Sequence, residues 1–477
     1  MSKGAAREAA AAPRSGELRP AGELRRILDG ARVERLANGL LVATLAAGQA
    51  PLVTTALIYR AGTRDDEAGH GGTAHFLEHM MFKGSPRYGP GEIDLLTRAL
   101  GGSNNAFTSH DMTLYYFTFA ADRWQQALEI ESDRMAGLTL DAEAVRHERQ
   151  VILEEIAMYE GEPWDALEQR VSAAAFPGHP YGRPVLGTRE QLLATGAEAL
   201  AAFHQRLYRP ANAVLVVAGD VGGGVTEQVE AAFGGLDGEA PRRAPSPPPA
   251  APNGLVRLER RAGEVARMLL SLPAPAATAD DHPLLRLLVA VLGAGRSSRL
   301  HRALVDEGQL CVGVSADLNE SVDPGGWTVA FEVIPGIEPR RAEETALAEI
   351  ERLRRQPPSA EEVARAQKIV LADWIFDHER VYQQAFLVGT ALALFDVEHP
   401  WRYLDRLLSV RADDLAAAAE RYLSPERAGV LGWSLPVGSS SEPSPPAPLP
   451  EGEGSSRSGI EPPSPPGKGG LGGEGSR

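Results

Sequence analysis

Residues 75–84 read HFLEHMMFKG, and this stretch carries the strongest signal in the chain. His75 and His79 are four residues apart, and Glu78 lies between them. On an α-helix such residues share a face, so both imidazoles could bind one ion with Glu78 beside it. Two imidazoles and a carboxylate suit zinc and leave one position open for water, for which a nearby glutamate is a suitable base. The alternative is a pair of exposed helix histidines beside a glutamate, so the interpretation depends on a third ligand.

A second stretch, HERQVILEEIAMYE at residues 147–160, offers acidic candidates for that third ligand. Glu148 and Glu155 are seven residues apart, which places them two turns along one helix face. One of them could bind the ion while the other orients a ligand from behind. Glu154 points about a quarter turn away from Glu155. An acidic run can equally be a solvated helix face.

Composition limits the class of protein and the kind of metal site. The chain has 477 residues, a formal net charge of -16 and one cysteine, Cys311. The acidic balance argues against nucleic acid as a partner, and a single cysteine allows neither an internal disulfide nor a thiolate metal cluster. No apolar run reaches the roughly eighteen residues of a membrane span, and the N-terminal segment lacks the apolar region of a secretory signal. We therefore expect a cytoplasmic protein, with a periplasmic location left open.

Two low-complexity stretches divide the chain into two blocks that resemble each other. The first block ends in RLYRPANAVLVVAGD and the second in RYLSPERAGVLGWSL, which indicates an internal duplication. The predicted organisation is a flexible segment 1–29, a metal-bearing domain 30–235, a Pro-rich linker 236–254, a second homologous domain 255–437 and a disordered tail 438–477.

Hydrophobic periodicity predicts an α+β fold, because strands in hairpin order alternate with long helices. We expect each domain to be an antiparallel-rich sheet packed with helices. Strands are expected at 51–60, in SNNAFTS and DMTLYYFTF, and near 311–318 and 327–334; helices are expected at about 72–82, 91–100, 122–136, from Asp141 with a break near Gly161–Pro163, and at 281–292, 297–306, 338–355, 359–395 and 411–422.

These motifs together resemble the inverted-zincin metallopeptidases, the group of pitrilysin, insulin-degrading enzyme and mitochondrial processing peptidase. The similar segments are GTAHFLEHMMFKGS, ALGGSNNAFTSHDMTLYYF, ERQVILEEIAMYE, PYGRPVLGT and YRPANAVLVVAGD, in the family's usual order, with LGAGRSSRLHRALVDEGQL in the second block. The resemblance spans about 33–436. It implies the short, processing-peptidase-like branch, in which two homologous domains pair into a clam-shell chamber.

The resemblance also implies a role for individual residues. His75, His79 and Glu155 match the family's zinc ligands, with one Zn²⁺ per chain, and Glu78 matches its general base. Glu148 matches a nearby acid that supports the site without binding the metal itself. Asn105 and Ala106 match the edge strand that holds an extended peptide substrate; the alternative for Asn105 is a turn cap.

The second block departs from the family at one place. Family members have an Arg and a Tyr there that help to hold the scissile carbonyl, whereas DEGQLCVGV puts Gly308 and Val312 in those positions. We therefore expect a heterodimer in which a homologous chain supplies the Arg/Tyr pair. The alternative is a homodimer, in which Arg296 or Arg299 would partly substitute for the missing arginine.

The expected function is that of a zinc-dependent endopeptidase that hydrolyses peptides or unfolded segments. Two other functions remain open for the same fold. One is a non-catalytic structural subunit of a larger complex, and the other is a module that binds extended peptides without cutting them. An intact HxxEH motif counts against the first, because a structural role does not need Glu78.

Overall fold

The two predicted blocks each build one β-sheet in the computed structural model. The predicted segment 1–29 and tail 438–477 lie outside the described residues, as does part of the predicted linker. The structure describes residues 30–47, 50–241, 246, 248–250 and 252–437. Within these residues, no helix combines the length and the apolar character that crossing a membrane requires.

The first sheet has six strands in the order β1-β2-β6-β3-β5-β4. The β2–β6 pair is parallel and the other pairs are antiparallel. The strand β6 is buried along its whole length, so this sheet must be covered on both faces. The strands are β1 (Ala31–Arg35), β2 (Leu41–Ala46), β3 (Leu52–Tyr59), β4 (Ser103–Thr108), β5 (Thr113–Ala120) and β6 (Ala213–Gly219).

The second sheet repeats this topology without the equivalent of β1. Its order is β7-β11-β8-β10-β9, and its β7–β11 pair is again parallel. Taken in chain order, the edge strand β4 of the first sheet corresponds to the edge strand β9 of the second. The strands are β7 (Gly254–Arg261), β8 (Arg267–Ala274), β9 (Cys311–Leu318), β10 (Gly325–Val333) and β11 (Ala428–Leu435). The molecule therefore consists of two similar α+β domains, as the sequence predicts.

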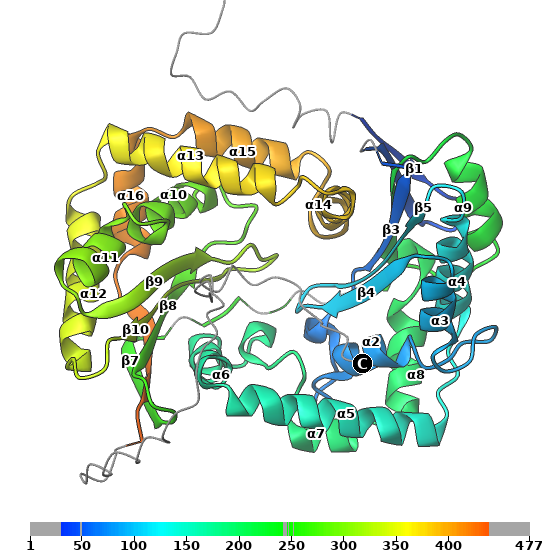
Figure 1. The fold of residues 1–477 in the computed structure, drawn as a ribbon, viewed down its shortest axis with the longest axis horizontal. Helices are drawn as coiled ribbons and strands as arrows, with labels where there is room; N and C mark the ends of the chain where they lie inside the picture. The colour runs from blue at the N-terminus through cyan, green and yellow to red at the C-terminus, as the bar shows by residue number, and fades with distance from the viewer. Residues whose placement is uncertain (1–29, 48–49, 242–245, 247, 251, 438–477) are drawn as a thin grey trace, which may run out of the picture.

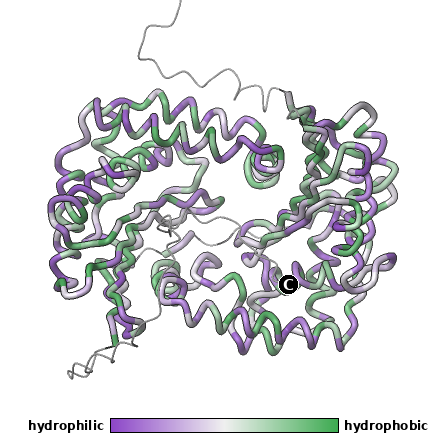
Figure 2. The backbone as a smooth tube through the Cα atoms, in the orientation of Figure 1, coloured by the Kyte–Doolittle hydropathy of each residue, from purple (hydrophilic) through white to green (hydrophobic). Residues whose placement is uncertain are grey.

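Helices surround both sheets, and in Figure 2 those at the rim of the molecule alternate between hydrophilic and hydrophobic residues. In the first half they are η1 (Thr63–Asp65), α2 (Thr73–Met80), α3 (Glu92–Ala99), α4 (Gln125–Ala136), α5 (Ala142–Gly161), α6 (Pro163–Ala175), η2 (Pro180–Gly182), α7 (Arg189–Ala194), α8 (Ala197–Leu207), η3 (Pro210–Asn212) and α9 (Val225–Phe233). In the second half they are α10 (His282–Gly293), α11 (Arg299–His301), the π-helical turn η4 (Arg302–Glu307), α12 (Pro339–Arg355), α13 (Ala360–Phe376), α14 (Val381–Leu394), α15 (His399–Ser409), η5 (Ala412–Asp414) and α16 (Leu415–Tyr422).

The two halves exchange helices. Each sheet is covered on one face by helices of its own half, while α6 of the first half packs on β8 and β11 and α14 of the second half packs on β3 and β6 (Figure 1). The contacts are close on both sides of the exchange. A Cβ added at Gly389 of α14 would lie 2.4 Å from Ile58 Cδ1, and one added at Gly432 of β11 would lie 2.5 Å from Val171 Cγ2 of α6. Each half therefore completes the core of the other.

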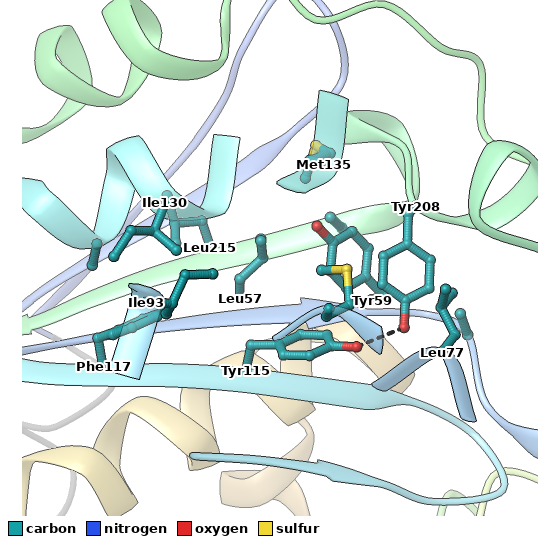
Figure 3. Close-up of a cluster of buried hydrophobic side chains, with 14 of the residues drawn as sticks. Leu57, Tyr59, Leu77, Ile93, Tyr115, Phe117, Ile130, Met135, Tyr208 and Leu215 are labelled. Atoms are coloured by element: carbon teal, nitrogen blue, oxygen red, sulfur yellow. Dashed lines mark hydrogen bonds between the residues drawn. The ribbon is translucent and has the colours of Figure 1, made fainter. Parts of the chain in front are cut away.

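The helix α2 rests on a core that is partly polar. Leu77 points from α2 into a cluster that includes Tyr59, Tyr115 and Tyr208, and the last two share a hydrogen bond of 3.0 Å (Figure 3). The guanidinium of Arg134 lies over the ring of Tyr115, 4.6 Å from its centre, and is fully buried against Glu131 at 2.7 Å. Because a buried ion pair tolerates little displacement, it favours a single position for the elements around it.

The structure corrects two predictions in the second half. The segment 359–395 is not one helix, because α13 ends at Phe376 and α14 begins at Val381 after a break. The residues Val363 and Ala366 of α13 pack in the core of the second half, whereas Val388 of α14 packs over the first sheet, so one straight helix could not make both sets of contacts. The segment 297–306 contains only a short α-helix followed by the π-helical turn.

Candidate metal centre

The helix α2 carries His75, Glu78 and His79, and its start is fixed by the backbone. Gly72 precedes it with φ 86°, and a Cβ at that position would lie 2.2 Å from the carbonyl oxygen of Leu186, so only glycine fits. The carboxylate of Asp66 accepts hydrogen bonds from the backbone N–H of Gly72 (2.7 Å) and of Ala74 (2.9 Å). This carboxylate satisfies donors at the helix start that would otherwise be unpaired.

The rotation of α2 follows from its apolar residues. Ala74, Phe76, Leu77 and Met80 are completely buried, so the remaining face of the helix turns toward α5 and β4. His75 lies on that face and is 8% exposed, while Glu78 and His79 are half-buried.

Three side chains converge on one point. The Nε2 atom of His75 lies 3.8 Å from Glu155 Oε2, and the Nε2 atom of His79 lies 3.7 Å from the same oxygen. One ligand atom from each of these residues lies within 4.8 Å of the others. Two ligands of a tetrahedral zinc ion are roughly 3.3 Å apart, as follows from bond lengths of about 2 Å. The two distances to Glu155 exceed this spacing by about half an ångström, and two imidazoles with one carboxylate are ligands that zinc prefers, so the residues present fit zinc.

Glu148 supports this set from the side away from Glu155. Its carboxylate accepts a hydrogen bond from His79 Nδ1 at 2.8 Å and pairs with Lys83 Nζ at 2.8 Å. A proton held at Nδ1 leaves the lone pair of Nε2 directed toward Glu155, which is the tautomer that a metal ligand needs. Glu154, in contrast, is exposed on the outer face of α5. The structure therefore brings Glu155 and Glu148 to the histidines and leaves Glu154 outside.

The protonation of these groups is set by burial and by their neighbours. Burial, followed by the nearby His79, lowers the pKa of His75 to about 3, so its imidazole is neutral and able to bind metal. Burial also lowers the pKa of His79, but the hydrogen bond to Glu148 and the surrounding carboxylates outweigh it, and the net shift is upward. Burial raises the pKa of both Glu78 and Glu155. A divalent cation here would stabilise these two half-buried carboxylates in their ionised form.

Glu78 has a partner that sequence reasoning missed. The hydroxyl of Thr108 donates a hydrogen bond of 2.5 Å to Glu78 Oε2. Thr108 is the last residue of β4 and is separated from Glu78 by 30 positions in the chain. Lys83, the partner of Glu148, was missed as well, although it is in the same stretch as the histidines. Lys83 lies just beyond the end of α2 and close to the motif in sequence, whereas Thr108 requires the fold.

The strand β4, which holds Asn105 and Ala106, is the terminal strand of its sheet and contacts α2. Its inner edge pairs with β5, where Asn105 is opposite Tyr116 and Ala106 opposite Tyr115. No strand among the described residues pairs with its outer edge. The Asn105 side chain accepts a hydrogen bond of 2.9 Å from the N–H of Ala106, so Asn105 lies within the strand and does not cap a turn.

The second half carries no cation at the place where the family pattern has an arginine. Gly308 follows the π-helical turn, and Val312 lies on the edge strand β9 with 65% of its surface exposed. Arg299 is held by both oxygens of Glu362, at 2.8 Å and 3.0 Å, so it is committed to an ion pair within its own half. The idea that Arg299 could substitute for the missing residue is therefore not supported.

Two family models match this chain. Residues 41–189 match the insulinase model of Peptidase family M16, and residues 196–370 match the Peptidase M16 inactive domain. Together the two models match more than half of the chain.

Curated relatives and solved structures agree with these models. An uncharacterized zinc protease of Mycobacterium leprae is 34% identical over 58% of this chain, and the match covers 63% of that protein, less than two thirds of its length. An uncharacterized zinc protease of Streptomyces coelicolor is 28% identical over 81% of this chain and 86% of its own. The crystal structure of a protease from Helicobacter pylori matches with a TM-score of 0.80 and 25% identity, over 85% of this chain and 99% of that one.

The relatives that match this chain are named zinc proteases, and members of the matching family use zinc as cofactor. The chain belongs to Peptidase family M16, the insulinase family.

Proposed function

We propose that this chain is a zinc-dependent endopeptidase that hydrolyses peptides or unfolded segments. The observation that carries the proposal is the convergence of His75, His79 and Glu155 beside Glu78. These three offer ligand atoms within 4.8 Å of one another, and Glu78 projects from the same helix as the two histidines. A structural or purely binding role would require neither the ligand set nor a buried carboxylate next to it.

Each residue has a distinct task in this proposal. Zinc, when bound, would supply Lewis acidity toward a peptide carbonyl and a water molecule. His75, His79 and Glu155 would hold the ion, and Glu148 would keep the His79 ring in its binding tautomer. Glu78 would accept the proton of the attacking water and then donate it to the nitrogen of the leaving amine. Its raised pKa suits both steps, because the carboxyl can hold the proton between them.

The edge strand β4 is the proposed substrate site. An extended peptide could add to the unpaired outer edge of β4 near Asn105 and Ala106 by main-chain hydrogen bonds. Such bonds depend little on the peptide's side chains, which suits a broad class of unfolded substrates. The contact between β4 and α2 would bring a peptide bound there close to the proposed metal ligands.

The test is the Glu78→Gln variant, with Glu154→Gln as its matched control. Glu154 is an exposed glutamate beside the proposed site but not in it. We expect Glu78→Gln to keep the zinc content of the wild type and to lose hydrolysis of an unfolded protein by roughly a hundredfold or more. Glu154→Gln should hydrolyse at the wild-type rate. Hydrolysis by Glu78→Gln at the wild-type rate, or hydrolysis by the wild type that a chelator does not affect, would refute the proposal.

We further propose a partner chain. The developing oxyanion needs donors beyond the metal, and removing one such donor commonly costs on the order of a hundredfold in rate. Gly308 and Val312 cannot act as donors through their side chains, and Arg299 is occupied by Glu362. A homologous chain with an Arg and a Tyr at these places would supply them in a heterodimer. A homodimer of lower activity is the alternative.

This second proposal is tested at matched zinc content. The purified chain is assayed alone and after mixing with a homologue from the same organism that has Arg and Tyr in those places. We expect a rise in kcat of at least about tenfold with the partner, and no rise when its Arg is changed to Ala. Full activity of the lone chain, unchanged by the partner, would rule out the heterodimer.

A further inference from the structure

The carboxylate of Glu78 is held by one side chain of β4. Its Oε2 atom accepts the 2.5 Å hydrogen bond from Thr108, while no hydrogen bond is present at Oε1 among the described residues. A glutamate side chain on a helix has several rotamers of similar energy, so a base at this position needs a second contact to fix it. Thr108 is such a contact, and it comes from a different element than the base itself.

No neighbouring group competes strongly with Glu78 for the hydroxyl hydrogen of Thr108. Thr113 lies opposite Thr108 in the β4–β5 pair, and their hydroxyl oxygens are 3.5 Å apart. The Thr113 hydroxyl donates at 2.8 Å to the carbonyl oxygen of Ala61, so its hydrogen is already used. A carboxylate is a stronger acceptor than a hydroxyl oxygen, and the contact to Glu78 is a full ångström shorter than the contact to Thr113.

Because Thr108 belongs to β4, its hydrogen bond to Glu78 links the proposed peptide-binding strand to the proposed base. Side chains alternate along a strand, so Ala106 and Thr108 share one face and Phe107 lies on the other. Ala106 packs against the core of the first half and Phe107 against the layer beneath α14, which fixes the face that Thr108 presents. The strand proposed to hold the peptide and the carboxylate proposed to accept the proton are therefore joined directly.

We propose that Thr108 is a positioning residue, whose hydroxyl fixes the Glu78 carboxylate in register with a peptide bound along β4. The inference rests on the proposed peptidase function. Thr108 would fix one oxygen of the carboxylate and leave Oε1 free for proton transfer. It would act on the chemical step and not on zinc binding, because it contacts none of the three proposed ligands.

The test compares Thr108→Val, which replaces the hydroxyl by a methyl group of similar size, with Thr108→Ser, which keeps it. Thr118→Val is the matched control, because Thr118 lies on the neighbouring strand and shares a hydroxyl hydrogen bond of 2.8 Å with Thr54. We expect Thr108→Val to lower kcat by about ten- to a hundredfold, with KM and zinc content within twofold of the wild type. Thr108→Ser should recover kcat to within about threefold of the wild type, and Thr118→Val should not change it.

A second measurement does not depend on activity. In crystal structures of the zinc-loaded proteins, the Glu78 carboxylate should have one orientation in the wild type and in Thr108→Ser, and a displaced or split one in Thr108→Val. Wild-type kcat in Thr108→Val, or an unmoved Glu78 in its crystal structure, would overturn the inference. If the wild-type chain, alone and with its partner, hydrolyses nothing, the proposed function fails, while the crystal structures still show whether Thr108 holds Glu78.

Discussion

The helices α2 and α10 occupy equivalent places in the two halves. Each follows the strand that is third from the edge strand β4 or β9 (β3 or β8), and each contacts that edge strand. The two helices differ in what they bury. In α10 the sequence HPLLRLLVAVLG is buried on nearly all sides, whereas α2 buries four apolar residues and keeps a polar face with two histidines and a glutamate. The same scaffold thus supports packing in one half and a set of metal ligands in the other.

The difference extends to the residues around these helices. Behind α2, Glu148 and Lys83 form a chain of charges that ends at His79. In the second half, most of α10 belongs to a large cluster of buried apolar side chains, and its polar residues His282 and Arg286 bond to Tyr403 and Glu320. A metal site therefore needs more than its ligands: the helix that faces them, here α5, must also carry acids at a spacing of two turns.

The largest effect should come from the metal ligand on α5. If only the first half binds metal, the wild type should bind one zinc ion per chain. Glu155→Gln should then weaken zinc binding by more than a hundredfold, because an amide oxygen is a poor zinc ligand. Glu154→Gln, on the exposed face of α5, should bind zinc like the wild type. Competition with a fluorescent chelator measures both affinities. Equal losses in the two variants would remove Glu155 from the site.

Acid should destabilise the first half through a buried histidine that lies outside the proposed metal site. His204 is buried on α8, donates a hydrogen bond to the carbonyl oxygen of Arg134, and has a pKa lowered by burial to about 4. The unfolded chain binds a proton near pH 6.5 and the folded chain does not, so stability is complete above that pH and falls as pH drops toward 4. The loss amounts to roughly 3 kcal/mol, at about 1.4 kcal/mol per pKa unit.

The measurement for His204 is the free energy of unfolding at pH 7 and at pH 4.5 in metal-free protein. His204→Gln keeps a donor for the Arg134 carbonyl but cannot titrate, so its stability should fall less between the two pH values. His147→Gln is the control, since the His147 side chain is 74% exposed. If His204→Gln and the wild type lose stability equally, His204 does not contribute to the acid sensitivity.

The support behind His79 should have a smaller effect than the ligand. Glu148→Gln keeps the size of the side chain but weakens the hydrogen bond that orients the His79 ring. Partners of this kind are typically worth about 10- to 100-fold in metal affinity. Glu143→Gln, on the same helix and 71% exposed, is the matched control. Zinc titration of both variants is the check, and wild-type affinity in Glu148→Gln would mean that the His79 ring is fixed by other contacts.

The smallest effect is expected on stability, when the packing of α14 of the second half on the first sheet is disturbed. Gly389→Leu would place a side chain against Ile58 and Val216, and overpacking of this kind costs about 1–3 kcal/mol, of which better helix propensity offsets roughly 1 kcal/mol. Gly161→Leu, at the end of α5 with open space around it, gives the propensity gain without the clash. Thermal unfolding should rank Gly161→Leu above Gly389→Leu. The reverse order would mean that α14 is loosely held on the first sheet.

Local sequence patterns predicted α2, α5, β4 and β5 well, because each pattern lies within one element. Spacing on one helix face gave the proximity of His75, Glu78 and His79, and the two-turn spacing on α5 distinguished Glu155 from Glu154. Polar and apolar alternation gave β4 and β5 with nearly correct ends. The roles of these residues in catalysis remain predictions.

Features that depend on distant contacts were not predicted. The break between α13 and α14 contains neither glycine nor proline, and it arises because the two helices pack on different sheets. The short strand β1 has four exposed residues and little hydrophobic pattern, so its pairing with β2 gave no signal. Thr108 and Glu78 are joined only because β4 returns to lie on α2.

The exchange of α6 and α14 has a consequence for how the chain is made. A ribosome completes the first sheet at Gly219, but the helix that covers its second face, Val381–Leu394, is synthesised much later. At a synthesis rate of about 5–20 residues per second, the apolar face around Ile58 and Val216 stays uncovered for on the order of ten seconds or more before α14 is made. During that interval the nascent chain leaves this apolar face uncovered, and the final fold can form only after most of the second half has left the ribosome.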